Sequence, residues 1–236
     1  MRYVSTRGQA PDLGFEEVLL TGLARDGGLY VPRDWPTLDA ATLASFAGAA
    51  YERVATRILS PFVAPDLEPA ELSSIVEESY ASFRHRAIAP LVQIAPGEWL
   101  LELFHGPTLA FKDVAMQVLA RLMDRALARR GARATIVGAT SGDTGGAAIE
   151  AFRGRAAIDV FILYPHGRVS DVQRRQMTTP TEANVHALAI DGTFDDCQAL
   201  VKALFNDHAL RDRLALSGVN SINWARVMAQ IVYYFT

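Results

Sequence analysis

Residues 134–146 read Ala-Thr-Ile-Val-Gly-Ala-Thr-Ser-Gly-Asp-Thr-Gly-Gly, a short β-branched run followed by a loop of small hydroxyl and glycine residues. The run Ala134–Gly138 predicts a buried strand, and a helical pattern follows from Thr144 to Phe152. A second compact run, Ile158–Tyr164, predicts the next strand. Because strand and helix alternate, the sequence indicates a parallel sheet covered on both faces by helices.

The same alternation continues on either side of these two strands. Asn184–Ile190 is a further strand candidate, and helical patterns are expected over Asp113–Arg130, Asp171–Met177 and Phe194–Phe205. In such sheets ligands collect at the carboxyl ends of the strands. We therefore expect an α/β domain over residues 91–236 with a ligand site at that edge of its sheet.

Residues 1–90 form a separate, mostly helical region in this interpretation, and no cluster of reactive side chains marks it as more than scaffold. Its expected helices are one around Phe15–Leu23 that ends near Gly27, one from Asp39 into the Ile58 region, and one that begins at Glu68-Pro69. At the other end of the chain, an amphipathic helix is expected with Trp224, Val227, Ile231 and Tyr234 on one face. No capping signal closes that helix, so the α/β domain is expected to be incomplete at its carboxyl end.

The totals describe an ordinary folded chain of 236 residues, of which half are hydrophobic and 21% are charged. The net charge of −3 gives no electrostatic reason to expect nucleic acid or an acidic membrane as a partner. The single cysteine, Cys197, excludes an internal disulfide framework and a multi-cysteine metal site, and it fits a reducing compartment. Without a signal-peptide core or an apolar run of about 20 residues, a cytoplasmic protein is expected.

One lysine stands where a structural lysine is unusual. Residues 104–117 read Phe-His-Gly-Pro-Thr-Leu-Ala-Phe-Lys-Asp-Val-Ala-Met-Gln, which places Lys112 at or near the first turn of a predicted helix. The helix macrodipole disfavours a cation there by a few tenths to about 1 kcal/mol, whereas the neighbouring Asp113 carries the charge that this position prefers. A lysine held there beside Phe111 suits a neutral or covalently modified amine, and a Schiff base is the obvious candidate.

The loop Thr140–Gly146 has the composition of an anion site. Its hydroxyl groups, its backbone N–H groups and the positive end of the following helix would converge on one ligand. It is not a nucleotide-binding P-loop, because no Gly-Lys-Ser/Thr closes it, and it lacks Gly-x-Gly-x-x-Gly spacing. The alternative is a well-capped helix without a ligand, with Ser141 or Asp143 as its N-cap.

Several other polar positions leave two interpretations open. His105 lies in the loop before Lys112, where a hydrogen-bonding role and an acid–base role both fit. The polar run Asn220–Arg226 either caps the following helix, through Ser221 or Asn223, or turns Asn223 or Arg226 toward the ligand cleft. No metal site is expected, because the spacing of metal ligands is missing at His166, His186 and His208.

These segments carry a resemblance to a known family. Phe104–Asp113, Thr140–Gly145, Asn220–Trp224 and Gln230–Phe235 resemble, in this order, segments of threonine synthases of the bacterial and fungal type. Near the amino terminus, the runs at residues 3–7 and 25–32 look like that family as well. The resemblance covers essentially the whole chain.

The resemblance implies a pyridoxal 5′-phosphate enzyme with the three-layer, parallel-sheet fold of type II, which is the tryptophan synthase β-like fold. Such enzymes convert O-phospho-L-homoserine and water to L-threonine and phosphate. The expected partner is therefore that small-molecule substrate, bound by a monomer or homodimer that contacts neither nucleic acid nor membrane. Lys112 matches the lysine that forms the Schiff base, which makes it the expected catalytic residue.

The resemblance also implies roles for residues around Lys112. Cofactor contacts are expected from Phe111 and Asp143, the latter at a position that many relatives of the fold fill with asparagine. Contacts to the substrate, and to its carboxylate in particular, are expected from Ser141, Gly142, Thr144 and Gly145. Further candidates for substrate contacts, including the substrate phosphate, are His105, Thr108, Asn223 and Arg226.

Two alternatives stay open beside a threonine synthase. A threonine-synthase-like phospho-lyase would keep the lysine but release phosphate and 2-oxobutyrate. The second alternative is an inactive fragment. Family members continue past Thr236 into a loop that binds the cofactor phosphate, so the chain is expected to be truncated and inactive by itself.

Overall fold

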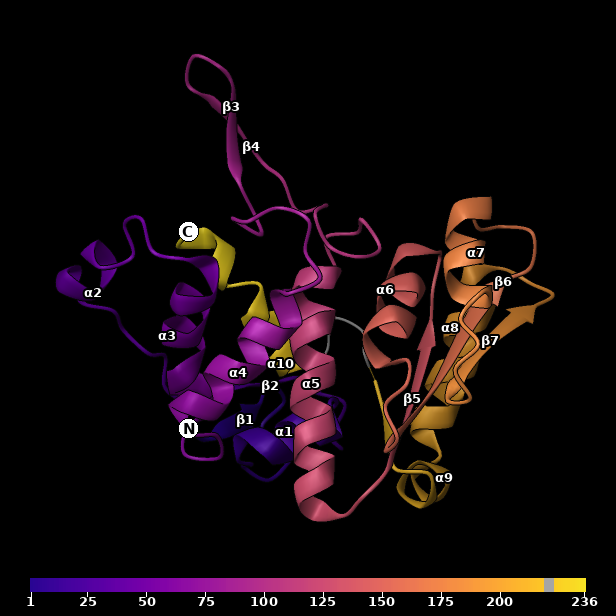
Figure 1. Cartoon of the computed structure of the whole chain (residues 1–236). Helices are drawn as coiled ribbons and strands as arrows, with labels where there is room; N and C mark the ends of the chain where they lie inside the picture. The colour runs from indigo at the N-terminus through magenta and orange to yellow at the C-terminus, as the bar shows by residue number, and fades with distance from the viewer. Residues whose placement is uncertain (219–222) are drawn as a thin grey trace.

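The computed structural model describes residues 1–218 and 223–236 (Figure 1). Its largest sheet contains four strands, all paired in parallel, in the order β7-β6-β5-β8. These strands are β5 (Ala134–Ala139), β6 (Ile158–Pro165), β7 (Val185–Ile190) and β8 (Leu216–Ser217). The predicted parallel sheet is confirmed, and the strands expected from the sequence match β5, β6 and β7 to within a residue at each end.

Helices cover both faces of this sheet because alternate residues of each strand point to opposite sides. On one face Ile136 and Val160 join the main hydrophobic core, which also contains the apolar face of α6 (Asp143–Phe152). On the other face Val137 and Leu163 pack in a second core that includes Cys197 of α8 (Phe194–Asn206). Two further helices belong to this part of the molecule, α7 (Asp171–Thr178) and α9 (His208–Arg213).

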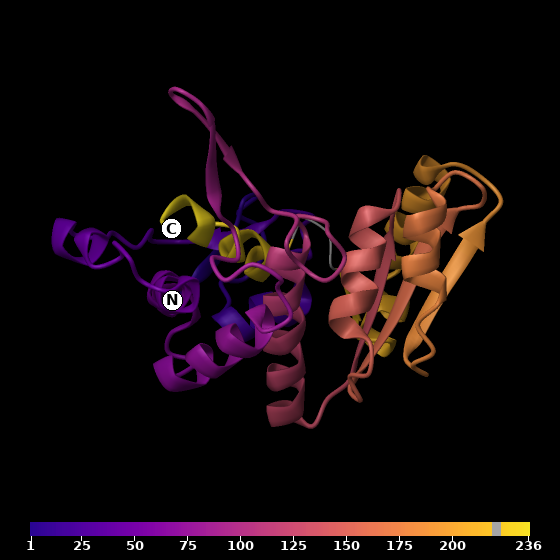
Figure 2. The ribbon, with the colours of Figure 1, turned by 45° about the horizontal axis from the view of Figure 1, so that its top comes forward.

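The long helix α5 (Asp113–Arg130) stands at the centre of the molecule and covers the range expected from its pattern. It packs against α4 (Pro69–Tyr80), α6 and α10 (Trp224–Ala229). Figure 2 shows the sheet and its helices on one side of α5 and the amino-terminal helices on the other. The amino-terminal half adds α1 (Phe15–Thr21), α2 (Ala40–Ala44), α3 (Tyr51–Val63) and an antiparallel pair, β1 (Tyr3–Ser5) with β2 (Tyr30–Pro32).

Two amino-terminal helices differ from the sequence prediction, in each case next to a glycine with positive φ. The first helix ends at Thr21 instead of near Gly27, because Gly22 takes a φ of 67° and the chain turns back into the Leu23–Leu29 bridge. The helix expected from Asp39 to the Ile58 region is two helices, α2 and α3, with Gly48 at a φ of 70° between them.

The carboxyl-terminal helix is also shorter than expected. Helix α10 ends at Ala229 and is followed by a 3-10 turn, Val232–Tyr234. The expected apolar face is therefore only partly correct, since Trp224 is buried but Tyr234 is largely exposed. The residues that α10 buries beside Trp224 are Ala225, Arg226, Met228 and Ala229.

An antiparallel hairpin that the sequence did not suggest projects from the body (Figures 1 and 2). It consists of β3 (Leu91–Ala95) and β4 (Glu98–Leu101), with Gly97 at a φ of 80° in the turn. Its exposed apolar side chains are those of Leu91, Val92, Ile94, Trp99 and Leu100. Among the residues that the structure describes, no helix combines the length and apolar character that crossing a bilayer requires.

Candidate active site

The fold brings Lys112 into contact with Asp143. Lys112 immediately precedes α5, as expected, and Asp143 begins α6 just after the carboxyl end of β5. The lysine Nζ donates a hydrogen bond to Asp143 Oδ2 at 2.5 Å. The lysine side chain is 14% exposed and the aspartate side chain 38%, so the pair lies at the edge of a protected site. The two segments with the strongest sequence signals therefore meet at one place.

Asp143 is ionised by its setting. Burial raises the pKa of its carboxyl, but the hydrogen bond and the charge of Lys112 outweigh burial and hold that pKa below the ordinary value. Lys112 Nζ also lies 4.1 Å from the centroid of the Phe111 ring, which adds a cation–π contact. Both contacts suit a charged ammonium. Nucleophilic use of Lys112 therefore requires that a proton first leave Nζ.

The loop before Lys112 is anchored on the buried carboxylate of Asp113. Thr108 donates its backbone N–H at 2.8 Å and its hydroxyl at 2.7 Å to that carboxylate. Burial raises the pKa of Asp113, and the bonds from Thr108 offset only part of this rise. A Cβ at Gly106 would lie 2.4 Å from Asp113 Cβ, so only glycine lets the loop approach this closely. Sequence reasoning credited Asp113 with a favourable charge and missed this anchoring role.

Thr140 organises the loop before α6. Its Oγ1 accepts hydrogen bonds from the backbone N–H groups of Gly142 at 2.9 Å and Gly145 at 2.8 Å. Two of the amides expected to face an anion are thus bonded within the loop. The N-cap position is held by Gly142 rather than by Ser141 or Asp143, because its φ of 142° is open only to glycine. Of the loop hydroxyls expected at the substrate, that of Ser141 is exposed and that of Thr144 half-buried.

Helix α7 closes one side of the site, and no residue of this helix was selected from the sequence. A cavity of about 490 Å³ is lined by both loops and by α7, with Phe111, Asp143, Ser170, Gln173 and Gln176 among its walls. Gln176 Nε2 donates to Thr108 O at 3.1 Å. A Cβ at Gly142 would lie 2.2 Å from Gln173 Oε1. These contacts link residues far apart in the chain, so no local pattern could have indicated them.

Two other candidates from the sequence, His105 and Asn223, bond to neighbouring groups of the protein. His105 pairs with Glu102, its Nε2 lying 2.7 Å from Glu102 Oε2, and its ring lies 4.9 Å from that of His85 in a tilted arrangement. Asn223 is buried and structural in its contacts, because its Nδ2 donates to Leu19 O at 2.9 Å and its Oδ1 accepts from Ala225 N at 3.0 Å. This arrangement matches the capping interpretation. The neighbouring candidates Asn220 and Ser221 lie outside the described residues.

Arg226 is a buried cation of the kind that can bind an anion. It is buried in α10, and its Nε has no hydrogen-bond partner among the described residues. Burial lowers the pKa of its guanidinium, whereas the charge of Asp143 raises it, so the two side chains share one electrostatic environment. Within residues 1–218 and 223–236, no cluster of histidine, cysteine, aspartate and glutamate side chains could hold a metal ion.

Comparisons with known proteins match the whole chain. A family model described as "Threonine synthase N terminus" matches residues 2–80, and one described as "Pyridoxal-phosphate dependent enzyme" matches residues 84–235. The chain is 58% identical over 235 residues to a threonine synthase of Pseudomonas aeruginosa and covers 50% of that protein. It is 41% identical over 236 residues to threonine synthase-like 2 of Xenopus laevis and again covers 50% of the relative. The chain therefore spans about half the length of the curated relatives it matches.

Solved structures agree with the sequence comparisons. The chain superimposes on a pyridoxal-phosphate-bound threonine synthase from Brucella melitensis with a TM-score of 0.94 and 62% identity, covering 100% of this chain and 51% of that one. Its TM-score to the yeast threonine synthase is 0.91 at 44% identity, covering 99% and 48% of the two chains. The fold class implied by the sequence resemblance is confirmed. The chain thus belongs to the pyridoxal-phosphate-dependent enzymes, with an amino-terminal region of the threonine synthase type.

Proposed function

We propose that this chain supplies the cofactor lysine of a threonine synthase, a lyase that forms L-threonine and phosphate from O-phospho-L-homoserine and water. The observation that carries the proposal is the contact of Lys112 Nζ with Asp143 at 2.5 Å, beside a cavity at the carboxyl edge of the sheet. The relatives at 58% and 62% identity, which are threonine synthases, support the same activity. Pyridoxal phosphate, when bound, supplies an electron sink for carbon–hydrogen bond cleavage next to an amine.

The residues at the site fit that cofactor. Lys112 is a primary amine shielded from solvent beside a cavity of about 490 Å³, and it would hold the aldehyde carbon. Phe111 and Asp143 would flank the bound group, because both already lie against Nζ. Within the described residues, the Nε of buried Arg226 has no hydrogen-bond partner and offers a donor for an anionic group at this site. An aldehyde that carries anionic groups is therefore compatible with the charges of this site.

Each residue of the site then has a distinct task. Asp143 orients Lys112 Nζ, and once Nζ has lost its proton the neutral Lys112 amine acts as a general base on the substrate Cα. We assign the substrate carboxylate to the hydroxyls of Ser141 and Thr144, whereas Gly142 and Gly145 let the loop pack closely against Gln173 and Met177. We assign the substrate phosphate to Arg226, because an anion would offset the cost of burying its guanidinium.

Borohydride trapping tests the lysine directly. The sequence contains two lysines, Lys112 and Lys202, so reduction in the presence of pyridoxal phosphate followed by peptide mapping has few outcomes. We expect the reduced label on Lys112, loss of that label in Lys112→Arg, and no loss in the matched control Lys202→Arg. Label confined to Lys202 or to the amino terminus would contradict the proposal.

The reaction is tested by its products. A synthase should convert O-phospho-L-homoserine to phosphate and threonine in equal amounts, whereas a phospho-lyase should release 2-oxobutyrate with the phosphate. The synthase is proposed because identity is higher to threonine synthases, at 58%, than to threonine synthase-like 2, at 41%. Phosphate release without threonine would assign the lyase reaction instead.

We further propose a cytoplasmic enzyme, monomeric or homodimeric, with an amino-terminal region at residues 1–90 and the cofactor domain at residues 91–236. The packing of α5 against α4 and of α10 against α1 and α3 supports close coupling of the two regions. They should therefore unfold in one cooperative transition. Two separate transitions in calorimetry would argue against this coupling.

A further inference from the structure

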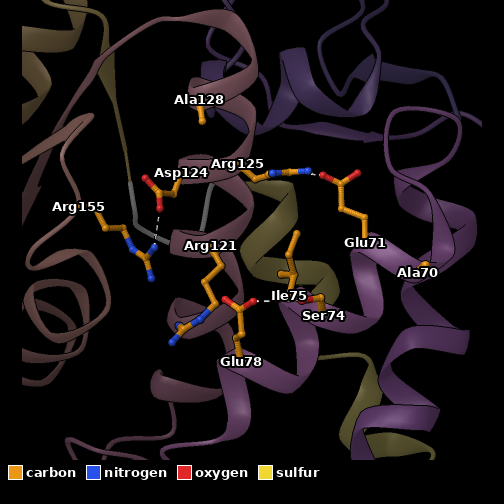
Figure 3. A pocket seen from close by; sticks show the side chains of 10 residues that line it. All are labelled: Ala70, Glu71, Ser74, Ile75, Glu78, Arg121, Asp124, Arg125, Ala128 and Arg155. Carbon is orange, nitrogen blue, oxygen red and sulfur yellow. Dashed lines mark hydrogen bonds and ion pairs between the residues drawn. The ribbon is translucent and has the colours of Figure 1, made fainter.

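A second cavity, of about 560 Å³, lies between α4 and α5 and contains none of the candidate active-site residues (Figure 3). It is lined by one face of each helix and by Arg155, which follows α6. Its central residue, Arg121, lies nine residues along α5 from Lys112, which corresponds to about 14 Å at the rise of an α-helix. The two cavities are therefore separate sites on the same helix.

Arg121 has more donor capacity than the surrounding protein uses. Its Nη1 donates to Gln117 O at 3.1 Å and to Gln117 Oε1 at 2.9 Å. Among the side chains that the structure describes, no carboxylate forms an ion pair with it, and its Nε and Nη2 donate to none. Burial and the charge of Arg155 lower the pKa of this guanidinium, and the charges of Glu78 and Asp124 offset only part of this effect. Arg121 is thus a partly desolvated cation near one like charge, Arg155, and two carboxylates that form no ion pair with it.

Arg155 brings a second guanidinium to the same space, as Figure 3 shows. Its side chain is only 17% exposed, and it is held by bonds from Nε to Ala151 O and from Nη1 to Asp124 Oδ2, both at 2.9 Å. These bonds fix the group and leave Nη2 available to a ligand. Two fixed guanidinium groups with free donors form a fork that suits a carboxylate or another oxyanion.

The remaining charges argue against a ligand that is only an anion. The cavity is lined by three arginines, Arg121, Arg125 and Arg155, and by three acids, Glu71, Glu78 and Asp124. Glu71 pairs with Arg125 and Asp124 with Arg155, whereas Glu78 accepts a hydrogen bond only from Ser74 Oγ, at 3.1 Å, within the described chain. Within the described chain, the charges that form no ion pair are therefore one guanidinium, Arg121, and one carboxylate, Glu78, although the charge of Glu78 acts on Arg121.

We propose that this cavity binds a small zwitterion of the amino-acid type, with its carboxylate on Arg121 and Arg155 and its ammonium group on Glu78. A ligand that carries both charges matches a lining whose net charge is zero and whose unpaired groups have opposite signs. Because the site contains no residue used in the proposed reaction, this inference does not depend on the proposed function.

Nuclear magnetic resonance titration of the isotope-labelled chain with L-serine tests the proposal. We expect saturable shifts of the Arg121 and Arg155 Nε–Hε signals and of neighbouring α4 and α5 amides, with a Kd on the order of 1 mM. Arg121→Gln and Glu78→Gln should each weaken binding by about tenfold or more. The matched control is Arg125→Gln, which lines the same cavity but already pairs with Glu71, and its Kd should be unchanged.

Three results would overturn the assignment. The first is the absence of a saturable response around α4 and α5, including a response confined to residues near Lys112. The second is binding that Arg121→Gln leaves unchanged while its circular dichroism spectrum shows a folded protein. The third is inorganic phosphate binding as tightly as L-serine with no effect of Glu78→Gln, which would make the cavity a simple anion site.

Discussion

Lys112 and Asp143 are 31 positions apart in the chain, yet their side chains form the closest charged contact of the candidate site. Each sits beside a helix N-terminus, a place that favours the aspartate and disfavours the lysine. The aspartate therefore compensates the lysine for its unfavourable position. This pairing explains how a charged amine can be held at the start of α5.

The Asp143 carboxylate should make stability depend on acid pH. Its folded pKa lies below the ordinary value of 3.8, so its stabilising contribution is present above that value and is lost as pH falls through the lower folded pKa. Asp143→Asn should remove this part of the acid dependence. Urea unfolding between about pH 2 and pH 6 measures it, with Asp195→Asn on the exposed surface of α8 as the control. Equal acid slopes for the native chain and Asp143→Asn would contradict the role of the pair.

Asn223 should behave as a structural residue. It is buried, caps α10 and donates to Leu19 O of α1, so Asn223→Ala leaves two backbone groups without their partner. We expect a loss of about 1–3 kcal/mol in the free energy of unfolding, measured by urea denaturation. Asn206→Ala, at the exposed end of α8, is the matched control and should cost little. A similarly small effect at Asn223 would favour the ligand-facing interpretation instead.

The strand–loop–helix unit from β5 to α6 depends on how closely α7 approaches Gly142. That glycine has a φ of 142°, and an added Cβ would lie 2.2 Å from Gln173 Oε1. Gly131, which ends α5, has a φ of 57° but open space around it. The two positions therefore separate the cost of backbone conformation from the cost of a steric contact.

Gly142→Ala should destabilise the protein more than Gly131→Ala. We expect about 1–2 kcal/mol for alanine at Gly131, from the left-handed backbone alone. Alanine at Gly142 should cost at least about 1–3 kcal/mol for backbone strain, plus displacement of the Gln173 side chain. Chemical denaturation of both variants measures the difference. Equal losses would show that α7 yields without cost and does not hold the loop.

The elements that sequence predicted well are those whose own side chains determine them. Helix α5 matches its expected range because its apolar spacing, its leading aspartate and its closing Gly131 all agree. The β3–β4 hairpin was missed because its apolar residues do not alternate between a buried and an exposed side. The break between α2 and α3 was missed because Gly48 lies within an otherwise helical composition.

The same distinction holds at the candidate site. Lys112 and the loop at residues 140–146 could be selected from the sequence because their composition is unusual for a helix start. The roles that the structure gives to Thr108, Thr140 and Gln176 could not be predicted, because these roles consist of hydrogen bonds within the tertiary fold. Composition indicates where chemistry can occur, and packing decides which neighbours orient it.

Across the whole molecule, one hydrophobic core runs from the amino-terminal helices through α5 to one face of the sheet. Apart from Leu101, which packs against this core, the β3–β4 hairpin projects away from it, with Ile94 62% and Trp99 55% exposed. An apolar two-stranded sheet with unpaired edges is a surface on which further strands can add. The hairpin should therefore be the main source of self-association in this chain.

Charges on the hairpin should suppress that self-association without unfolding the protein. Ile94→Lys combined with Trp99→Lys should lower the sedimentation-detected oligomer fraction at high concentration. The free energy of unfolding should change by no more than about 0.5 kcal/mol, because both side chains are exposed. Leu200→Lys, an exposed apolar site on α8, is the control and should leave association unchanged. If the double variant associates as strongly as the native chain, another surface causes the self-association.

The second core offers a way to measure local opening of the chain in solution. Cys197 is buried there between α8 and the sheet, and it is the only sulfhydryl in the sequence. A thiol-specific dye can reach Cys197 only during transient local opening of this layer. The rate of dye incorporation therefore reports local opening between α8 and the sheet. It does so separately from changes around Lys112, on the opposite side of the sheet.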